Sequence, residues 1–234
     1  TLEYAGQERD FFVRPFPVPP LHTRIAGRTV LVVVRGHAYK EDLKACLPFI
    51  RNERPVLIGV DGGADALVEF GLLPDLIVGD MDSVSSPTLS AVAERVVHGY
   101  LDGRAPGLQR LADLHLNGHV VRAPGTSEDV AILLAYDAGA RLIVAVGTHT
   151  SMIDFLEKGR AGMSSTFLTR LRTGDRLVDA KGVSQLYKPP QRTAAVWGIV
   201  AAGLIPVTFA VALSSTLRNL LMLVWLNLRM TLGF

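Results

Sequence analysis

The chain has 234 residues, which is enough for one large domain or two small ones. The formal net charge is only +2, and residues 193–234 contain two arginines and no acidic residue. Without those two arginines, residues 1–192 hold 22 basic and 22 acidic side chains, so we expect no nucleic acid partner. The single cysteine, Cys46, excludes an intramolecular disulfide framework and a cysteine-rich zinc site.

Residues 1–23 are expected to be the end of a helix from an upstream region, followed by a linker. Residues 1–12 mix charged and apolar side chains, as the end of a helix can. Four prolines follow within residues 14–20, and they remove backbone donors and favour an extended path.

Residues 24–190 are expected to form one α/β domain. The run TVLVVV at 29–34 is apolar and rich in β-branched residues, which is typical of a strand buried on both faces. Further strands are expected at 55–60, 75–79, 95–98, 119–123 and 141–146, with helices at 39–51, 64–70, 87–94, 106–114, 127–138, 152–158 and 164–171. Residues 176–187 add one or two expected edge strands. Strands that alternate with helices indicate a mostly parallel, doubly wound sheet.

Ligands of such sheets bind outside the carboxyl ends of the strands. Polar residues and glycines follow the expected strands or open the next helix: Arg35, Asp61, Gly62, Gly63, Asp80, Asp82, Ser83, Thr126, Ser127, Glu128, Asp129, Gly147, Thr148 and His149. The four aspartates among them should meet at one edge, where clustered carboxylates need a cation and suit Mg²⁺. Helix N-termini and glycine-rich turns at the same edge supply N–H groups for phosphate oxygens.

Each of these signals also has a structural interpretation. The segments DGG at 61–63 and GDMDS at 79–83 are good turn sequences. Asp129 fits a capping box with Thr126 at the start of a helix. His149 fits a loop residue that only donates or accepts hydrogen bonds, and residues 159–165 fit either a phosphate cradle or consecutive helix caps.

The run at 56–85, VLIGVDGGADALVEFGLLPDLIVGDMDSVS, resembles the nucleotide-binding half of thiamine pyrophosphokinases. The family motifs correspond to residues 61–65 and 74–83 and to the Glu128–Asp129 pair, within a resemblance over roughly 28–160. The resemblance implies that Asp80, Asp82 and Asp129 hold Mg²⁺ and the phosphates of ATP or ADP, with Asp61 beside them. The candidate nucleotide-binding residues are Arg35, Asp61, Gly62, Gly63, Asp80, Ser83, Thr126, Ser127, Gly147, Thr148 and His149.

The chain also departs from that family. The segment GTHTSMIDF at 147–155 replaces the later G-G-R-x-D-H element and lacks its arginine and its final histidine. Only about 18 residues separate Gly174 from the apolar tail, too few for the β-sandwich domain that forms the family's thiamine site with a dimer mate. We therefore expect no thiamine pocket, and no diphosphoryl transfer to thiamine.

Residues 193–217 are predicted to form a transmembrane helix. Residues 194–217 carry no charge over 24 positions, which spans a hydrocarbon core of ~30 Å at about 1.5 Å per residue. Lys181, Lys188 and Arg192 precede this segment and favour a cytoplasmic body. Residues 218–234 are expected to be an amphipathic, interfacial tail on the outer side, with Trp225 as an anchor.

This order of domains, with the segments VVVRGHAYKEDL, GTSEDVAILLA and LVDAKGVSQLY, is similar to the actinobacterial SteA proteins. The likeness runs over essentially the whole chain, without the N-terminal domain of that family. It implies a single-pass protein of the plasma membrane at the division septum. It also implies a membrane partner, SteB, and an influence on cell separation through peptidoglycan hydrolysis.

Two functional hypotheses follow. In the first, the chain is a membrane-tethered scaffold, expected as a homodimer, whose degenerate kinase-like module senses a nucleotide. In the second, it is an active Mg²⁺-dependent diphosphokinase that uses ATP on an unknown acceptor. Release of AMP distinguishes the two, because diphosphoryl transfer produces AMP and binding does not.

Overall fold

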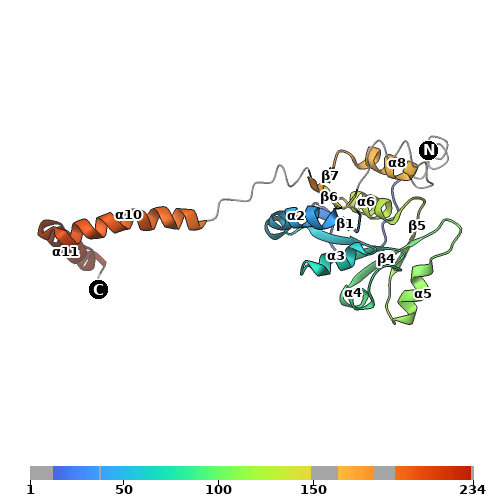
Figure 1. Ribbon diagram of the computed structural model, residues 1–234, viewed down its shortest axis with the longest axis horizontal. Coiled ribbons are helices and arrows are strands. Elements are labelled where there is room, and N and C mark those ends of the chain that lie inside the picture. Colours follow the sequence, from blue (N-terminus) through green and yellow to red (C-terminus); the bar gives the residue numbers. More distant parts are fainter. Residues whose placement is uncertain (1–12, 37, 149–162, 182–192, 233–234) are drawn as a thin grey trace. The chain divides into compact units, whose positions relative to one another are not determined.

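A computed structural model describes residues 13–36, 38–148, 163–181 and 193–232 (Figure 1). The chain divides into two compact units, Thr1–Lys188 and Pro189–Phe234, and each is treated by itself below. The expected helix end at 1–12, the expected helix at 152–158 and His149 lie outside the described residues.

The first unit is built on a seven-stranded sheet in the order β5-β4-β3-β2-β1-β6-β7. The strands are β1 (Thr29–Val34), β2 (Val56–Val60), β3 (Leu76–Gly79), β4 (Glu94–Gly99), β5 (His119–Arg122), β6 (Leu142–Val146) and β7 (Leu177–Asp179). Every described strand pair is parallel. The strand order reverses between β1 and β6, so the sheet is doubly wound, as expected from the sequence.

Helices cover both faces of the sheet. On one face lie α2 (Tyr39–Glu53), α3 (Gly63–Glu69), α4 (Ser86–Ala91) and α5 (Pro106–Asp113), and on the other lie α6 (Ser127–Asp137) and α8 (Met163–Thr173). The central strands are therefore buried on both sides, which explains their uninterrupted apolar runs. Helix α6 is apolar nearly all round because it packs between the sheet and α8.

The expected linker packs on the domain where it is described. Phe16 is buried, and its amide donates to Asp137 Oδ2 at 3.0 Å. Further along, the amides of His22 and Thr23 donate to the carboxylate of Glu94 at the start of β4. Prolines prevent this segment from forming a helix, and these contacts hold it on the sheet instead.

The predicted edge strands are represented by β7, which pairs with β6, while residues 182–187 lie outside the described residues. The second unit holds α10 (Thr193–Leu213) and α11 (Ser215–Leu232). Within the described part of the chain no single helix is long and apolar enough for a membrane span. The segments Ala201–Leu213 and Ser215–Met230 meet that test together as a pair bent by 100°. The transmembrane helix at 193–217 thus stays a prediction.

Candidate functional site

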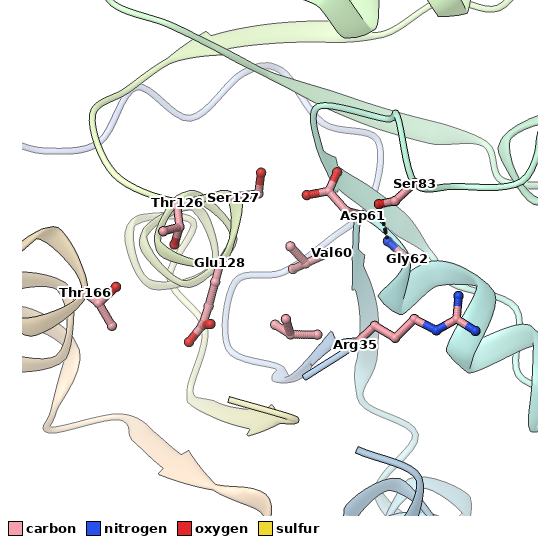
Figure 2. A pocket seen from close by; sticks show the side chains of 10 residues that line it. Arg35, Val60, Asp61, Gly62, Ser83, Thr126, Ser127, Glu128 and Thr166 are labelled. Atoms are coloured by element: carbon pink, nitrogen blue, oxygen red, sulfur yellow. Dashed lines mark hydrogen bonds between the residues drawn. The ribbon is translucent and has the colours of Figure 1, made fainter. Parts of the chain in front are cut away.

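A cavity of about 650 Å³ opens at the carboxyl ends of β1 and β2, beside the first turn of α6 (Figure 2). Its lining consists of Val34, Arg35, Val60, Asp61, Gly62, Ser83, Thr126, Ser127, Glu128 and Thr166. Six of these residues belong to the predicted nucleotide-binding set. Val34, Val60, Glu128 and Thr166 do not belong to it.

Asp61 and Asp80 come together because β2 and β3 are neighbours in the sheet. Asp61 follows β2 in a left-handed conformation, with its amide donating to Val78 O and its Oδ1 accepting from Met81 N at 3.2 Å. Burial and the nearby carboxylate of Asp80 raise the pKa of Asp61 to about 6, although a hydrogen bond with Ser127 opposes this shift. Asp61 therefore holds its proton more firmly than an exposed aspartate does.

Glycines give the turns around Asp61 their close approaches. A Cβ on Gly79, whose φ is 148°, would lie 1.8 Å from Asp61 Oδ1. A Cβ on Gly63 would lie 1.9 Å from Val33 O, so glycine is required where α3 begins against β1. Gly62 donates its amide to Ser83 Oγ at 3.1 Å and thereby ties the turn after β2 to the loop after β3.

The loop after β3 is held by an arginine of α5. Arg110 donates to the carbonyl oxygens of Met81 at 2.7 Å, of Val84 at 2.5 Å and of Asp82. Within the loop, Asp82 donates its amide to Asp80 Oδ1 at 3.0 Å, while the Asp82 side chain is exposed and does not line the cavity. The loop thus has a defined backbone path that presents Asp80 beside Asp61.

Asp129 is a helix cap and not part of the cavity wall. The residue is fully buried, and its Oδ2 accepts from Thr126 N, Thr126 Oγ1, Ser165 Oγ and Thr166 Oγ1 at 2.8–3.2 Å. Thr126 Oγ1 accepts in turn from Asp129 N, which completes the capping box that the sequence offered as an alternative. Burial raises the pKa of Asp129, although its hydrogen bonds with Thr126, Ser165 and Thr166 oppose the shift.

The predicted magnesium ligands do not meet at one point. Asp80 lies beside Asp61, Asp82 is exposed, and Asp129 caps α6. Across the described ranges, no group of three or more His, Cys, Asp or Glu side chains is arranged to hold a metal ion. A magnesium site at this edge therefore stays a prediction, and the Asp61–Asp80 pair is its best-placed part.

Glu128 is the acidic residue of the cavity that was absent from the predicted binding set. Burial, together with the carboxylate of Asp129, raises the pKa of Glu128 to about 7, against the opposing charge of Arg170. Its Oε1 is buried and has no hydrogen-bond partner among the described residues. Sequence reasoning placed Glu128 in a helix-starting turn and had no signal for its burial.

The remaining predicted residues are dispersed. Arg35 reaches the cavity, but its guanidinium pairs with Glu69 at 3.1 Å and donates to the Tyr39 hydroxyl. Thr148 lies outside the lining and donates to Asp179 Oδ1 at 3.2 Å. Gly147 also lies outside the lining and packs against the turn after β1.

Comparisons with known proteins agree with both resemblances read from the sequence. Residues 40–153 match the family model of the thiamin pyrophosphokinase catalytic domain, and residues 181–232 match that of the SteA-like C-terminal domain. Among solved structures, the chain is similar to a thiamine pyrophosphokinase from Bacillus subtilis, with 22% identity and a TM-score of 0.38. That match covers 64% of this chain and 60% of the enzyme's chain. No curated protein matches the chain. The chain thus combines a region similar to the thiamin pyrophosphokinase catalytic domain with a terminal region similar to the SteA-like C-terminal domain.

Proposed function

We propose that the chain is a membrane-anchored scaffold of the cell-division machinery whose kinase-like module binds a nucleotide as a signal. The observation that carries this proposal is the cavity at the carboxyl edge of the sheet, seven of whose ten lining residues belong to the region that matches the thiamin pyrophosphokinase catalytic domain. The match of residues 181–232 to the SteA-like C-terminal domain supports the division role, together with the sequence resemblance to SteA proteins.

The cavity has the groups that a nucleotide and its cation require. Asp61 of the cavity wall, with Asp80 beside it, would hold Mg²⁺, since a divalent cation offsets the burial and the neighbouring negative charge that raise the pKa of Asp61. The Mg²⁺ would neutralise this pair and supply positive charge to phosphate oxygens. Arg35 and the hydroxyl of Ser83 lie on the same side of the cavity and would contact those phosphates (Figure 2).

The sequence and the site favour nucleotide binding without diphosphoryl transfer. The segment 147–155 lacks the arginine and the histidine of the family's later element. In addition, Asp129 is already engaged by Thr126, Ser165 and Thr166, so one of the expected metal ligands serves the fold. We therefore assign the module a regulatory role, in which nucleotide binding biases homodimer formation or contact with a SteB-like membrane partner.

The membrane assignment rests on the tail. Residues 194–217 are uncharged, and residues 193–234 contain no acid, so this tail suits a bilayer with anionic lipids. In α11, the guanidinium carbon of Arg229 lies 5.5 Å from the ring centroid of Trp225 in an exposed, apolar helix. We propose a single-pass anchor in the plasma membrane, with the body in the cytoplasm and the protein at the septum.

Calorimetric titration of Mg·ATP and Mg·ADP into the full chain in mild detergent tests the nucleotide site. Saturable binding that Asp80→Asn abolishes, and that the exposed control Asp113→Asn leaves intact, is the expected result. An AMP assay on the same samples should stay at background. AMP production would establish the diphosphokinase alternative, and absence of binding of any Mg²⁺–nucleotide at millimolar concentration, whichever its base, would refute the site.

A further inference from the structure

Four buried side-chain atoms in the described residues have no hydrogen-bond partner, and all belong to the junction of α6 and α8. They are Glu128 Oε1, Asp129 Oδ1, Thr169 Oγ1 and Arg170 Nε. Buried polar atoms in native proteins are nearly always satisfied by protein, water or a bound ligand. Among these four residues only Glu128 lines the cavity, so its carboxyl group is the one that lies beside a bound ligand, although Oε1 itself is buried.

The neighbouring described groups do not donate a hydrogen bond to Glu128 Oε1. Arg170 is the cation whose charge acts on it, but the two terminal nitrogens of Arg170 donate to Asp179 and Thr148 at 3.2–3.5 Å. Thr166, which also lines the cavity, donates its hydroxyl to Asp129. Glu128 therefore places a carboxyl group at one side of the cavity, and one of its oxygens, Oε1, is buried without a hydrogen-bond partner among the described residues (Figure 2).

The charge at this side sets the orientation of a nucleotide. Glu128 and Asp129 place two carboxyl groups in the first turn of α6, which disfavours a phosphate there. Arg35, Gly62 and Ser83 line the other side, and the apolar side chains of Val34 and Val60 belong to the wall as well. The phosphates therefore belong with Arg35 and the base belongs with Glu128.

A carboxylate pairs best with two parallel N–H donors. Guanine presents such a pair, N1–H and the 2-amino group, on one edge, whereas adenine has an acceptor at N1. We propose that Glu128 makes this pocket selective for guanine nucleotides through that edge. This inference rests on the proposed nucleotide-binding function and names the nucleotide that function uses.

The test varies the ligand first and the protein second. Mg·GDP, Mg·IDP and Mg·ADP are titrated calorimetrically into the full chain, because IDP keeps N1–H and lacks the 2-amino group. We expect GDP to bind at least about tenfold more tightly than ADP, with IDP in between. Glu128→Gln should weaken GDP binding about tenfold and change ADP binding less than about threefold, while the exposed control Glu41→Gln changes neither.

The outcomes separate this inference from the function on which it rests. Equal affinity for GDP, IDP and ADP in the unmodified chain would overturn guanine selectivity and leave nucleotide binding intact. Absence of binding by all three would overturn both. If Glu128→Gln does not fold, the comparison of the three nucleotides on the unmodified chain still decides the question.

Discussion

Replacement of Asp61 by asparagine should stabilise the protein, with a gain that grows as the pH rises from about 4 to about 6 and then stays level. The pKa of Asp61 is raised from 3.8 to about 6 in the folded state, chiefly by burial and by the carboxylate of Asp80. A carboxyl group with a raised folded-state pKa contributes its stability below its unfolded pKa and loses it as the pH passes through 6. Asparagine does not ionise, so the variant avoids that loss.

The magnitude follows from the size of the pKa shift. A difference of about two units at 1.36 kcal/mol per unit amounts to at most about 3 kcal/mol at pH 8, and to little near pH 4. In a domain of this size, that free energy corresponds to roughly 6–12 °C in melting temperature. The amide side chain of the variant keeps a carbonyl oxygen that can accept from the Met81 amide, so the turn after β2 retains this hydrogen bond.

Urea denaturation of the full chain and of Asp61→Asn at pH 5, 6.5 and 8, without Mg²⁺, measures this effect. The raised pKa of Glu128 influences both proteins alike and cancels in the difference. Asp113→Asn, an exposed substitution on α5, serves as the control and should track the unmodified chain at each pH. A variant that is no more stable at pH 8, or whose advantage does not grow with pH, would refute the reasoning.

Three further predictions concern the cap, the loop and the tail. Thr126→Ala should lower the free energy of unfolding by about 1–2 kcal/mol in denaturant titrations, because it removes the N-cap side chain of α6 and one hydrogen-bond partner of Asp129. An unchanged denaturation midpoint would show that the cap is dispensable. Arg110→Lys should weaken Mg²⁺-dependent nucleotide binding in calorimetry as much as Arg110→Ala does. The reason is that one ammonium group does not replace a guanidinium group that donates to three carbonyl oxygens. Binding by Arg110→Lys as tight as that of the unmodified chain would contradict this. Deletion of residues 193–234 should abolish flotation with anionic liposomes, and a truncated chain that still floats would show that the body binds membranes.

Local patterns in the sequence were sufficient for most of the first unit. The apolar run at 29–34 predicted β1 to the residue, because a strand buried on both faces favours a nearly continuous run of apolar side chains. Because the carboxyl ends of parallel strands meet at one edge of a sheet, the sequence also predicted that Asp61 and Asp80 share an edge. The adjacency of β2 and β3 confirms this prediction. The sequence also predicted a turn after β3, and Gly79 is needed there because a Cβ at this position would overlap the side chain of Asp61.

The tertiary structure decided what the first turn of α6 does. The sequence allowed Asp129 to be a metal ligand or a cap, and both interpretations used the same residues. The choice depends on Ser165 and Thr166 of α8, some 36 residues away, which donate to Asp129. Arg170 of the same helix acts on Glu128, whose Oε1 is buried without a hydrogen-bond partner among the described residues. Burial depends on packing between segments that are distant in the sequence, so a local sequence pattern does not predict it. The role of Glu128 in the cavity was therefore recognised only in the folded structure.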